Sequence, residues 1–447
     1  MTRTTTRTAI IFFLFRLYIY WSVLWGFLVL TIPGLAQYMP LLLKGIDACM
    51  MVTAVLYASM TYFAISDEAV RRKLQRLFCA CLVLPLSSLG VAYVHGANIT
   101  SAMVYAIALL RPLSLLMAAI AIATSSLKTS YRKRQRLIRR DLYFLSGLQM
   151  LVSSLQLLAP SVGRAFLVRL SKRQSSYLVF SHGHTPGTFP NSIDFAYFLF
   201  AAYAVIYYDM TLHSKRPPIL MTLIFFFFIA VSGSLTATIC FGLLASFLYF
   251  RAAGKASLAT AFLLSATTVP LLALNSSTVA QAIRLKVANM MLSRLGLLFI
   301  SAPDLLTKYP WLALFGASGD FHFLLRLIRR LGSVPLIFTY RHSANTINDV
   351  FWVAVVLAVG IPLAAFYVWT FFDALMHFIA PRRERTISYK FSRWLCLLLI
   401  VSGFLNQILL LRAFSIALIV GLIPVSTIIL GRDSADQTLY SSVSAAM

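Results

Sequence analysis

Apolar runs of about 18 or more residues recur from one end of the chain to the other, with short polar segments between them. As a helix, each run is long enough to cross a hydrocarbon core roughly 30 Å thick. The pattern predicts an all-α, polytopic membrane protein with about twelve transmembrane helices in one membrane domain, residues 1–447. The first apolar run is too long for a cleaved signal, so it counts as a span. The predicted spans are 15–35, 46–65, 77–94, 102–126, 141–160, 192–212, 219–233, 234–250, 256–274, 349–376, 394–412 and 413–430.

Composition agrees with this pattern and excludes an ordinary soluble domain, because 60% of the 447 residues are hydrophobic and only 12% are charged. The formal net charge is +26, from 39 Lys and Arg against 13 Asp and Glu. Such an excess fits membrane lipid with anionic head groups or a phosphorylated substrate. Nucleic acid is not expected as a partner of a membrane-embedded chain.

The distribution of charge predicts the topology. Short basic loops are typical of the cytoplasmic side, and five of them fit there together with the N-terminus. Residues 1–274 then hold spans one to nine, with a basic external loop at 161–191. Residues 275–348 form a large external loop, and residues 349–447 hold the last three spans and a cytoplasmic tail. The basic loops are residues 71–76, 128–140, 213–218, 251–255 and 381–393.

The two external loops are unexpectedly basic. Long loops cross the membrane regardless of their charge, which is one explanation. The explanation we favour is that the loops hold an anionic substrate, because arginine's planar fork suits phosphate oxygens. The arginines considered for this role are Arg164 and Arg169 in the first loop and Arg294, Arg326, Arg329, Arg330 and Arg341 in the second.

Part of the second loop has the spacing of an amphipathic helix. His322, Arg326, Arg329 and Arg330 follow at i, i+4, i+7 and i+8, with leucine and isoleucine on the opposite face. Asp320 is placed to cap the start of this helix. Two arrangements stay open: the helix lies on the bilayer with its cations near lipid phosphates, or it closes over a lipid-linked diphosphate.

The sequence carries no signature of metal or nucleotide chemistry. There is no GxxxxGK[ST] loop for direct ATP use, no HExxH motif and no cluster of cysteine and histidine ligands. The five cysteines lie in or beside predicted spans, without metal-ligand spacing. We therefore expect neither a metal nor a cofactor.

The segment "TYRHSANTIND", residues 339–349, is the strongest candidate for a reaction centre. His342 follows Arg341 and precedes a predicted span, and both neighbours favour the neutral imidazole that accepts a proton from a hydroxyl. Alternatively, Asn345 or Asn348 simply caps the following helix. Arg111 is predicted inside a span, where a cation normally needs a partner or a cavity.

Four segments in order resemble the bacterial O-antigen ligase and O-antigen polymerase superfamily. They are the Gly-Thr-Phe segment at 187–205, the Ser-Gly-Ser turn in 230–250, the Ser-Arg to Gly-x-x-Gly segment at 293–321, and the His/Asn segment at 342–366. The resemblance implies a membrane glycosyltransferase of helical C-type fold (GT-C) in the bacterial inner membrane. It also implies transfer of a glycan from undecaprenyl diphosphate to a hydroxyl on the periplasmic side, without a metal.

Residue roles follow from the same resemblance. Arg294 matches the arginine of the Ser-Arg motif and is the expected diphosphate ligand. His342 is the first candidate base and His322 the second. The chain departs from the family pattern at Leu235, where an arginine is common, and at Ala344, where ligases have the histidine that here stands two residues earlier.

These departures favour a surface polysaccharide polymerase, which extends a glycan on a new undecaprenyl-diphosphate-linked repeat unit. A ligase that uses lipid A core as acceptor is the alternative within the family. A flippase or exporter of lipid-linked oligosaccharide is the alternative of another class. Whether a chain-length regulator protein binds is left open.

Overall fold

The computed structural model describes a helical protein, as the sequence predicts. In the described part of the chain, all regular secondary structure is helix. The fold class is therefore confirmed at the level of a helical membrane protein. The described residues are 3–31, 35–65, 67–125, 131–159, 161, 185–189, 191–213, 215, 218–249, 294–331, 344–380, 387–404 and 406–424.

Six helices in this part of the chain are long and apolar enough to cross a membrane. They lie in α1, α2, α3, α4, α8 and α18, and three shorter apolar helices accompany them. The count of twelve spans stays a prediction, and the span at 256–274 lies outside the described residues. The described elements are α1 Arg3–Thr31, α2 Leu35–Tyr62, α3 Glu68–Val94, α4 Ile99–Ser125, α5 Tyr131–Leu158, α8 Ser192–Leu212, α9 Ile219–Val231, α10 Leu235–Tyr249, η2 Leu297–Ser301, α13 Ala302–Lys308, α14 Pro310–Phe315, α15 Phe321–Arg329, α17 Ala344–Asp349, α18 Phe351–Ile379, α19 Ile387–Gly403, η3 Ile408–Leu410 and a helix Arg412–Pro424. The helix Arg412–Pro424 is the last one among the described residues, and we call it the final helix.

The boundaries of α19 differ at both ends from the predicted span, which was expected to run over 394–412. It begins earlier, at Ile387, and ends at Gly403. The chain then turns because two polar residues bind neighbouring helices instead of continuing the helix: the amide of Asn406 donates to Tyr197 (3.3 Å), and Gln407 accepts from Asn348 (2.7 Å).

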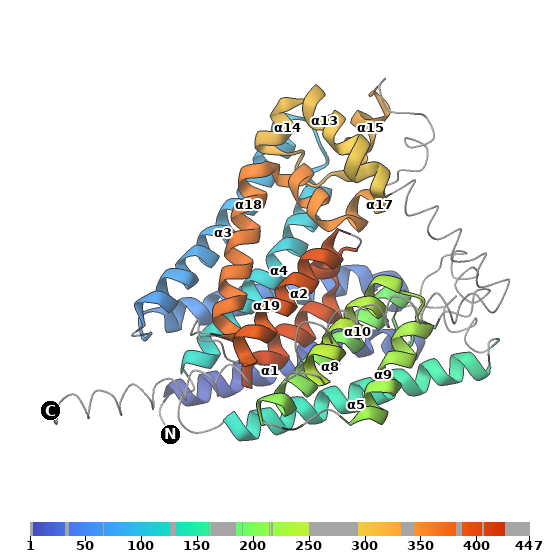
Figure 1. Ribbon diagram of the computed structural model, residues 1–447. Helices are drawn as coiled ribbons and strands as arrows, with labels where there is room; N and C mark the ends of the chain where they lie inside the picture. Colours follow the sequence, from blue (N-terminus) through green and yellow to red (C-terminus); the bar gives the residue numbers. More distant parts are fainter. Residues whose placement is uncertain are drawn as a thin grey trace.

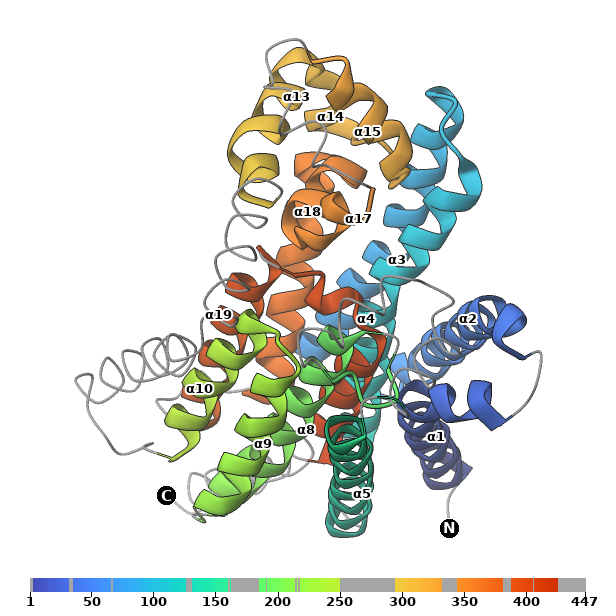
Figure 2. The same ribbon diagram turned by 90° about the vertical axis from the view of Figure 1, so that its right-hand side faces the viewer.

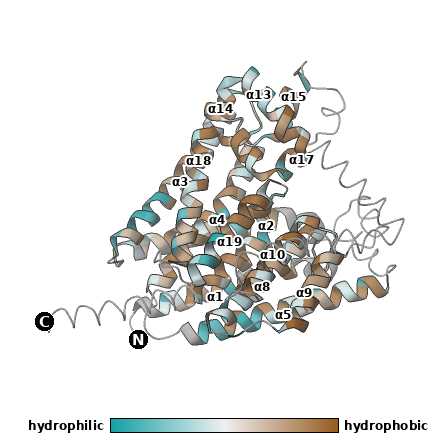
Figure 3. Cartoon of the chain, viewed as in Figure 1, coloured by the Kyte–Doolittle hydropathy of each residue, from teal (hydrophilic) through white to brown (hydrophobic). Residues whose placement is uncertain are grey.

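Long helices support a smaller group of helices at one end of the molecule. In Figure 1, α3, α4 and α18 rise toward α13, α14 and α15, which we call the cap. Figure 2 shows α5 and α1 nearly end-on, at the opposite end from the cap. Figure 3 shows apolar residues along most of the long helices and hydrophilic residues at the end of α3 farthest from the cap.

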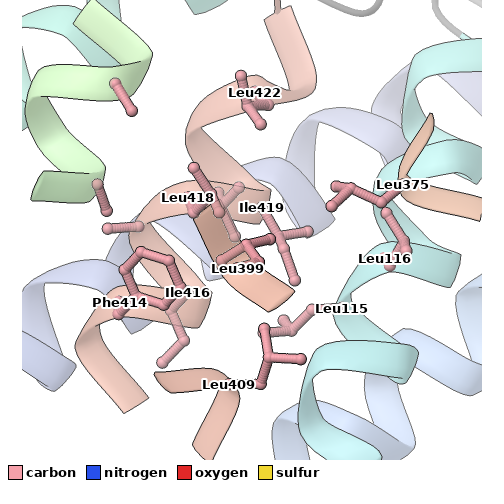
Figure 4. Close-up of a cluster of buried hydrophobic side chains, with 14 of the residues drawn as sticks. Leu115, Leu116, Leu375, Leu399, Leu409, Phe414, Ile416, Leu418, Ile419 and Leu422 are labelled. Atoms are coloured by element: carbon pink, nitrogen blue, oxygen red, sulfur yellow. The ribbon is translucent and has the colours of Figure 1, made fainter. Parts of the chain in front are cut away.

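The centre of the bundle is a continuous apolar core. Leu115 and Leu116 of α4, Leu375 of α18 and Leu399 of α19 lie around the final helix, which contributes Phe414 (Figure 4). Each of these side chains is at most 1% exposed. The apolar all-round pattern of these helices follows from this burial against other helices.

A break in α18 positions the cap. Gly360 has a left-handed φ of 80° and a ψ of 164°, and Pro362 follows it. Because Pro362 has no N–H and Gly360 turns the backbone, the carbonyls of Leu357 and Ala358 lose their helical partners. Unpaired carbonyls are costly in an apolar environment, so this break needs other donors.

The segment 316–320 supplies those donors and fastens the cap to three helices. The N–H groups of Ala317 and Ser318 donate to the two carbonyls at 2.7 and 2.8 Å. The hydroxyl of Ser88 in α3 donates to the carbonyl of Ser318 (2.9 Å). Asp320 accepts from the backbone N–H of Asn98 ahead of α4 (3.0 Å). The cap is therefore held by hydrogen bonds to α3, α4 and α18.

The close approach at this contact generates a prediction. A Cβ on Gly316 would lie 2.4 Å from the carbonyl carbon of Ala358, and its φ is +72°. We expect Gly316→Ala to cost at least about 1–3 kcal/mol from backbone strain, and more from the clash. Gly90→Ala is the matched control, because a Cβ there meets nothing within 4 Å. Thermal unfolding in detergent, followed by tryptophan fluorescence, checks this, and equal midpoints for the two variants would contradict it.

Candidate functional site

Polar groups interrupt the apolar core of the bundle, and we call them the polar layer. Its centre is Asp47 of α2, a carboxylate that is only 4% exposed. Arg412, at the start of the final helix, donates through Nε and Nη2 to both carboxylate oxygens at 2.8–3.0 Å. Tyr18 of α1 donates its hydroxyl to Oδ1 at 2.5 Å. This geometry joins α1, α2 and the final helix through one buried carboxylate.

Arg111 of α4 completes this cluster. Its Nη1 lies 3.5 Å from the Asp47 carboxylate, and its Nη2 donates to the carbonyl of Leu410 (3.0 Å). Of the two alternatives for this intramembrane arginine, a partner or a cavity, the structure shows a partner. Its Nε is buried and makes no hydrogen bond within the described part of the chain. Asp47 is thus the counter-ion of both guanidinium groups.

A second cluster extends the polar layer to the start of α18. Arg294 donates from Nη2 to Oδ2 of Asp349 at 3.2 Å. Asn348, the preceding residue, donates to Gln407 (2.7 Å). Capping of the span by Asn345 or Asn348 was the alternative interpretation, but Asn348 lies within α17 and its side chain binds Gln407. Val350 stands at the cap position of α18, without a side-chain hydrogen bond.

Burial raises the pKa of the Asp349 carboxyl above its ordinary value, and the nearby Arg294 guanidinium only partly offsets that increase. Asp349 precedes α18 and its side chain is 31% exposed. The pair therefore consists of a partly dehydrated carboxylate and a partly exposed arginine at the cap side of the bundle. Such an arginine can exchange its carboxylate for a more highly charged anion.

The Gly-Thr-Phe segment is fixed by a polar stripe on α5. Gln149, Ser153 and Gln156 lie at i, i+4 and i+7 on that helix, and all three bind residues 185–188. Thr188 also donates its hydroxyl to the carbonyl of Val23 in α1 (2.9 Å). These bonds set the start of α8, whose bounds of 192 and 212 match the prediction.

The start of α8 lies near the cluster of Asp47, Arg111 and Arg412. The Asn191 side chain caps α8 by accepting from the N–H of Asp194 (2.7 Å). The charges of Arg412 and Arg111 act on the Asp194 carboxylate. Asp194 is thus a second acidic group, besides Asp47, near these two arginines.

The cationic helix of the cap is formed as predicted. Asp320 caps α15 by accepting from the N–H groups of His322 and Phe323. Its apolar face is buried in the cap, so the helix does not rest on the bilayer through that face. Its exposed side chains are those of His322, Arg326, Arg329 and Arg330.

The predicted site residues fall into three groups. Arg294 and Asn348 lie in the polar layer. His322, Arg326, Arg329 and Arg330 lie together on α15, which packs against α17. Arg164, Arg169, Arg341 and His342 lie outside the described residues, and of Asn345 only the backbone, in α17, is described.

Sequence reasoning did not find Asp47, Arg412 or Tyr18 as members of the site. The signal available was Arg111 itself: an intramembrane cation requires an acidic partner, and Asp47 is an acid near the end of a predicted span. Among the described residues, no group of three His, Cys, Asp or Glu side chains gathers as metal ligands. No protein-family model, curated protein or solved structure compared with this chain matches it.

The shared carboxylate predicts a strong effect of Asp47→Asn. The change leaves the buried Arg111 and the partly buried Arg412 without their shared counter-ion, and removal of one partner from a buried pair typically costs about 3–5 kcal/mol. Adding Arg412→Gln removes one of the two stranded charges, so the double variant should be more stable than Asp47→Asn alone. Thermal unfolding of the wild type, both single variants and the double variant measures this coupling. Strictly additive losses would contradict it.

The raised pKa of Asp349 predicts a pH dependence. A group whose pKa is raised in the folded state stabilises the fold fully below its unfolded pKa, and this contribution is lost as the pH rises through the folded value. The stability of the wild type relative to Asp349→Asn should therefore be greater at about pH 4 than at about pH 8. Unfolding midpoints of both proteins across this range test the sign. A difference that grows with pH would refute it.

Proposed function

We propose that the protein is a surface polysaccharide polymerase of the bacterial inner membrane. It moves a growing glycan from undecaprenyl diphosphate to a hydroxyl of a new lipid-linked repeat unit on the periplasmic side. The observation that carries this proposal is the Arg294–Asp349 pair at the cap-side start of α18. It places a partly exposed guanidinium beside membrane-crossing helices, where the head group of a lipid-linked substrate would lie.

The chemistry requires stabilisation of the leaving group and removal of one proton. The acceptor oxygen bonds to the anomeric carbon of the donor sugar, and the bond from that carbon to the diphosphate breaks. The diphosphate leaves with the electron pair, and Arg294 stabilises its charge. The hydroxyl proton passes to a base, for which His342 remains the first candidate and His322 the second.

The remaining arginines are proposed to attract the substrate, because they are positively charged and the substrate is an anion. Arg326, Arg329 and Arg330 form an exposed cationic surface on α15, next to α17. This surface would attract the anionic donor toward Arg294, and Arg164, Arg169 and Arg341 are proposed for the same role. No metal or cofactor is needed, because guanidinium groups neutralise the leaving diphosphate.

The proposal predicts that Arg294→Ala abolishes chain extension. Loss of a positioned charge at a leaving group typically lowers the rate by about 100-fold or more. Arg294→Lys should recover only part of the rate, because an ammonium lacks the planar fork. The assay uses the full chain in liposomes with undecaprenyl-diphosphate-linked repeat units, and the ladder of products is measured on gels.

Arg72→Ala is the matched control, because Arg72 is an exposed arginine at the end of α3 opposite the cap. It should leave the ladder unchanged. Products that appear only when lipid A core is added would identify a ligase instead. Movement of lipid-linked oligosaccharide across the bilayer without any new glycosidic bond would identify a carrier. Equal rates for Arg294→Ala and Arg72→Ala would refute the role of Arg294.

A further inference from the structure

The cap presents apolar side chains on one side. In α14, "PWLALF", no residue is charged, and Leu314 and Phe315 are 58% and 56% exposed. The neighbouring end of α3 exposes Tyr93 to 81%. The two elements are in contact, because the His95 ring stacks on Trp311 with 3.9 Å between ring centroids. Large apolar side chains gathered in this way mark a surface that another apolar phase covers.

This surface is continuous with helices that cross the membrane. Leu82 and Leu86 of α3 are 63% and 67% exposed, and Ile361 of α18 is 49% exposed. Gly360, next to Ile361, touches the backbone of Leu314 so closely that a Cβ there would lie 2.3 Å from its carbonyl oxygen. The exposed face of α14 therefore extends the lipid-facing side of α3 and α18.

The ends of α3 and α18 farthest from the cap provide a reference position for measuring depth in the membrane. Lys73 of α3 binds Asp373 of α18 at 2.6 Å. Arg76 lies over the Trp369 ring, 4.4 Å from its centroid. Charged side chains and tryptophan typically gather where hydrocarbon meets head groups. This level therefore marks the membrane boundary opposite the cap.

The helical rise along α18 and α3 gives the distance of the cap from that boundary. At about 1.5 Å per residue, α18 rises about 20 Å from Asp373 to Gly360, beside the end of α14. On α3, the rise from Lys73 to Ser88, which binds the Ser318 carbonyl, is about 22 Å. The hydrocarbon core is roughly 30 Å thick, and tilting a helix only shortens its vertical rise. Both helices place the end of α14 within the core.

We propose that α14 is a re-entrant helix, whose exposed face contacts the acyl chains of the leaflet on the cap side. Trp311 lies at the interface beside His95, and the chain descends to Phe315. It turns at residues 316–318 and returns to Asp320, which binds the backbone of Asn98. Non-helical backbone is tolerated at such depth only where protein covers it and satisfies its polar groups. The hydrogen bonds of this turn to α18 and α3 meet that requirement.

The charges of the cap agree with this orientation. Its exposed cations lie on α15 and at Lys308, whose Nζ donates to the carbonyl of Arg330 (3.3 Å). The cap therefore has one apolar side, toward lipid, and one cationic side, away from it. This proposal does not depend on glycan transfer, so a failure of the proposed function would leave it unaffected.

Depth-dependent fluorescence quenching tests the re-entrant helix. The full chain, with its five native cysteines replaced, would carry one cysteine at Phe315→Cys, labelled with a small fluorophore in lipid nanodiscs. We expect strong quenching by lipids with a nitroxide in the middle of the acyl chain. We also expect quenching by aqueous iodide to be several-fold weaker than at Arg329→Cys, which is exposed on α15.

Leu86→Cys is the positive control, because this side chain lies on the outer face of α3. Phe315→Cys should resemble it in both measurements, with retention of the folded monomer peak on size exclusion. Iodide quenching at Phe315→Cys equal to that at Arg329→Cys would overturn the proposal. Protection from both iodide and lipid nitroxides would also overturn it, because a second copy of the chain would then cover this face.

Discussion

The structure depends on two backbone carbonyls that α18 cannot satisfy by itself. Gly360 and Pro362 break the helix, and the segment 316–318 replaces the missing donors. In a low-dielectric environment, neither half of this contact is stable without the other. Gly316 must also lack a side chain, because the two backbones touch. The cap, the break and the glycines therefore form one unit.

Charge pairing imposes a second constraint of the same kind. Arg111 lies inside the bundle and requires Asp47, which in turn fixes Arg412 and Tyr18. These residues come from four separate helices, so the polar layer sets how the helices meet. The same layer holds Asn348 and Gln407, which place Asp349 and Arg294 at the cap side. The proposed site thus rests on contacts that also stabilise the fold.

Local patterns predicted several elements correctly, whereas features that depend on distant residues were missed. The bounds of α8 and the Asp320 cap follow from nearby residues, and both are confirmed. The early end of α19 depends on Tyr197 and Asn348, which are remote in sequence. The break at Gly360 was read as a continuous span, because its apolar pattern does not change there. Asp47 and Arg412 could be paired with Arg111 only once the helices were placed.

The arrangement also bears on whether the protein transfers a glycan or carries it across the membrane. Beneath the polar layer, α4, α18, α19 and the final helix pack through large buried side chains such as Leu399 and Phe414. A carrier would have to open this core to pass a polar oligosaccharide, at a high cost in buried apolar contacts. A transferase needs only the cap-side surface, where Arg294 is partly exposed beside lipid-facing helices. The packing of the core therefore supports chemistry at one face over passage through the bundle.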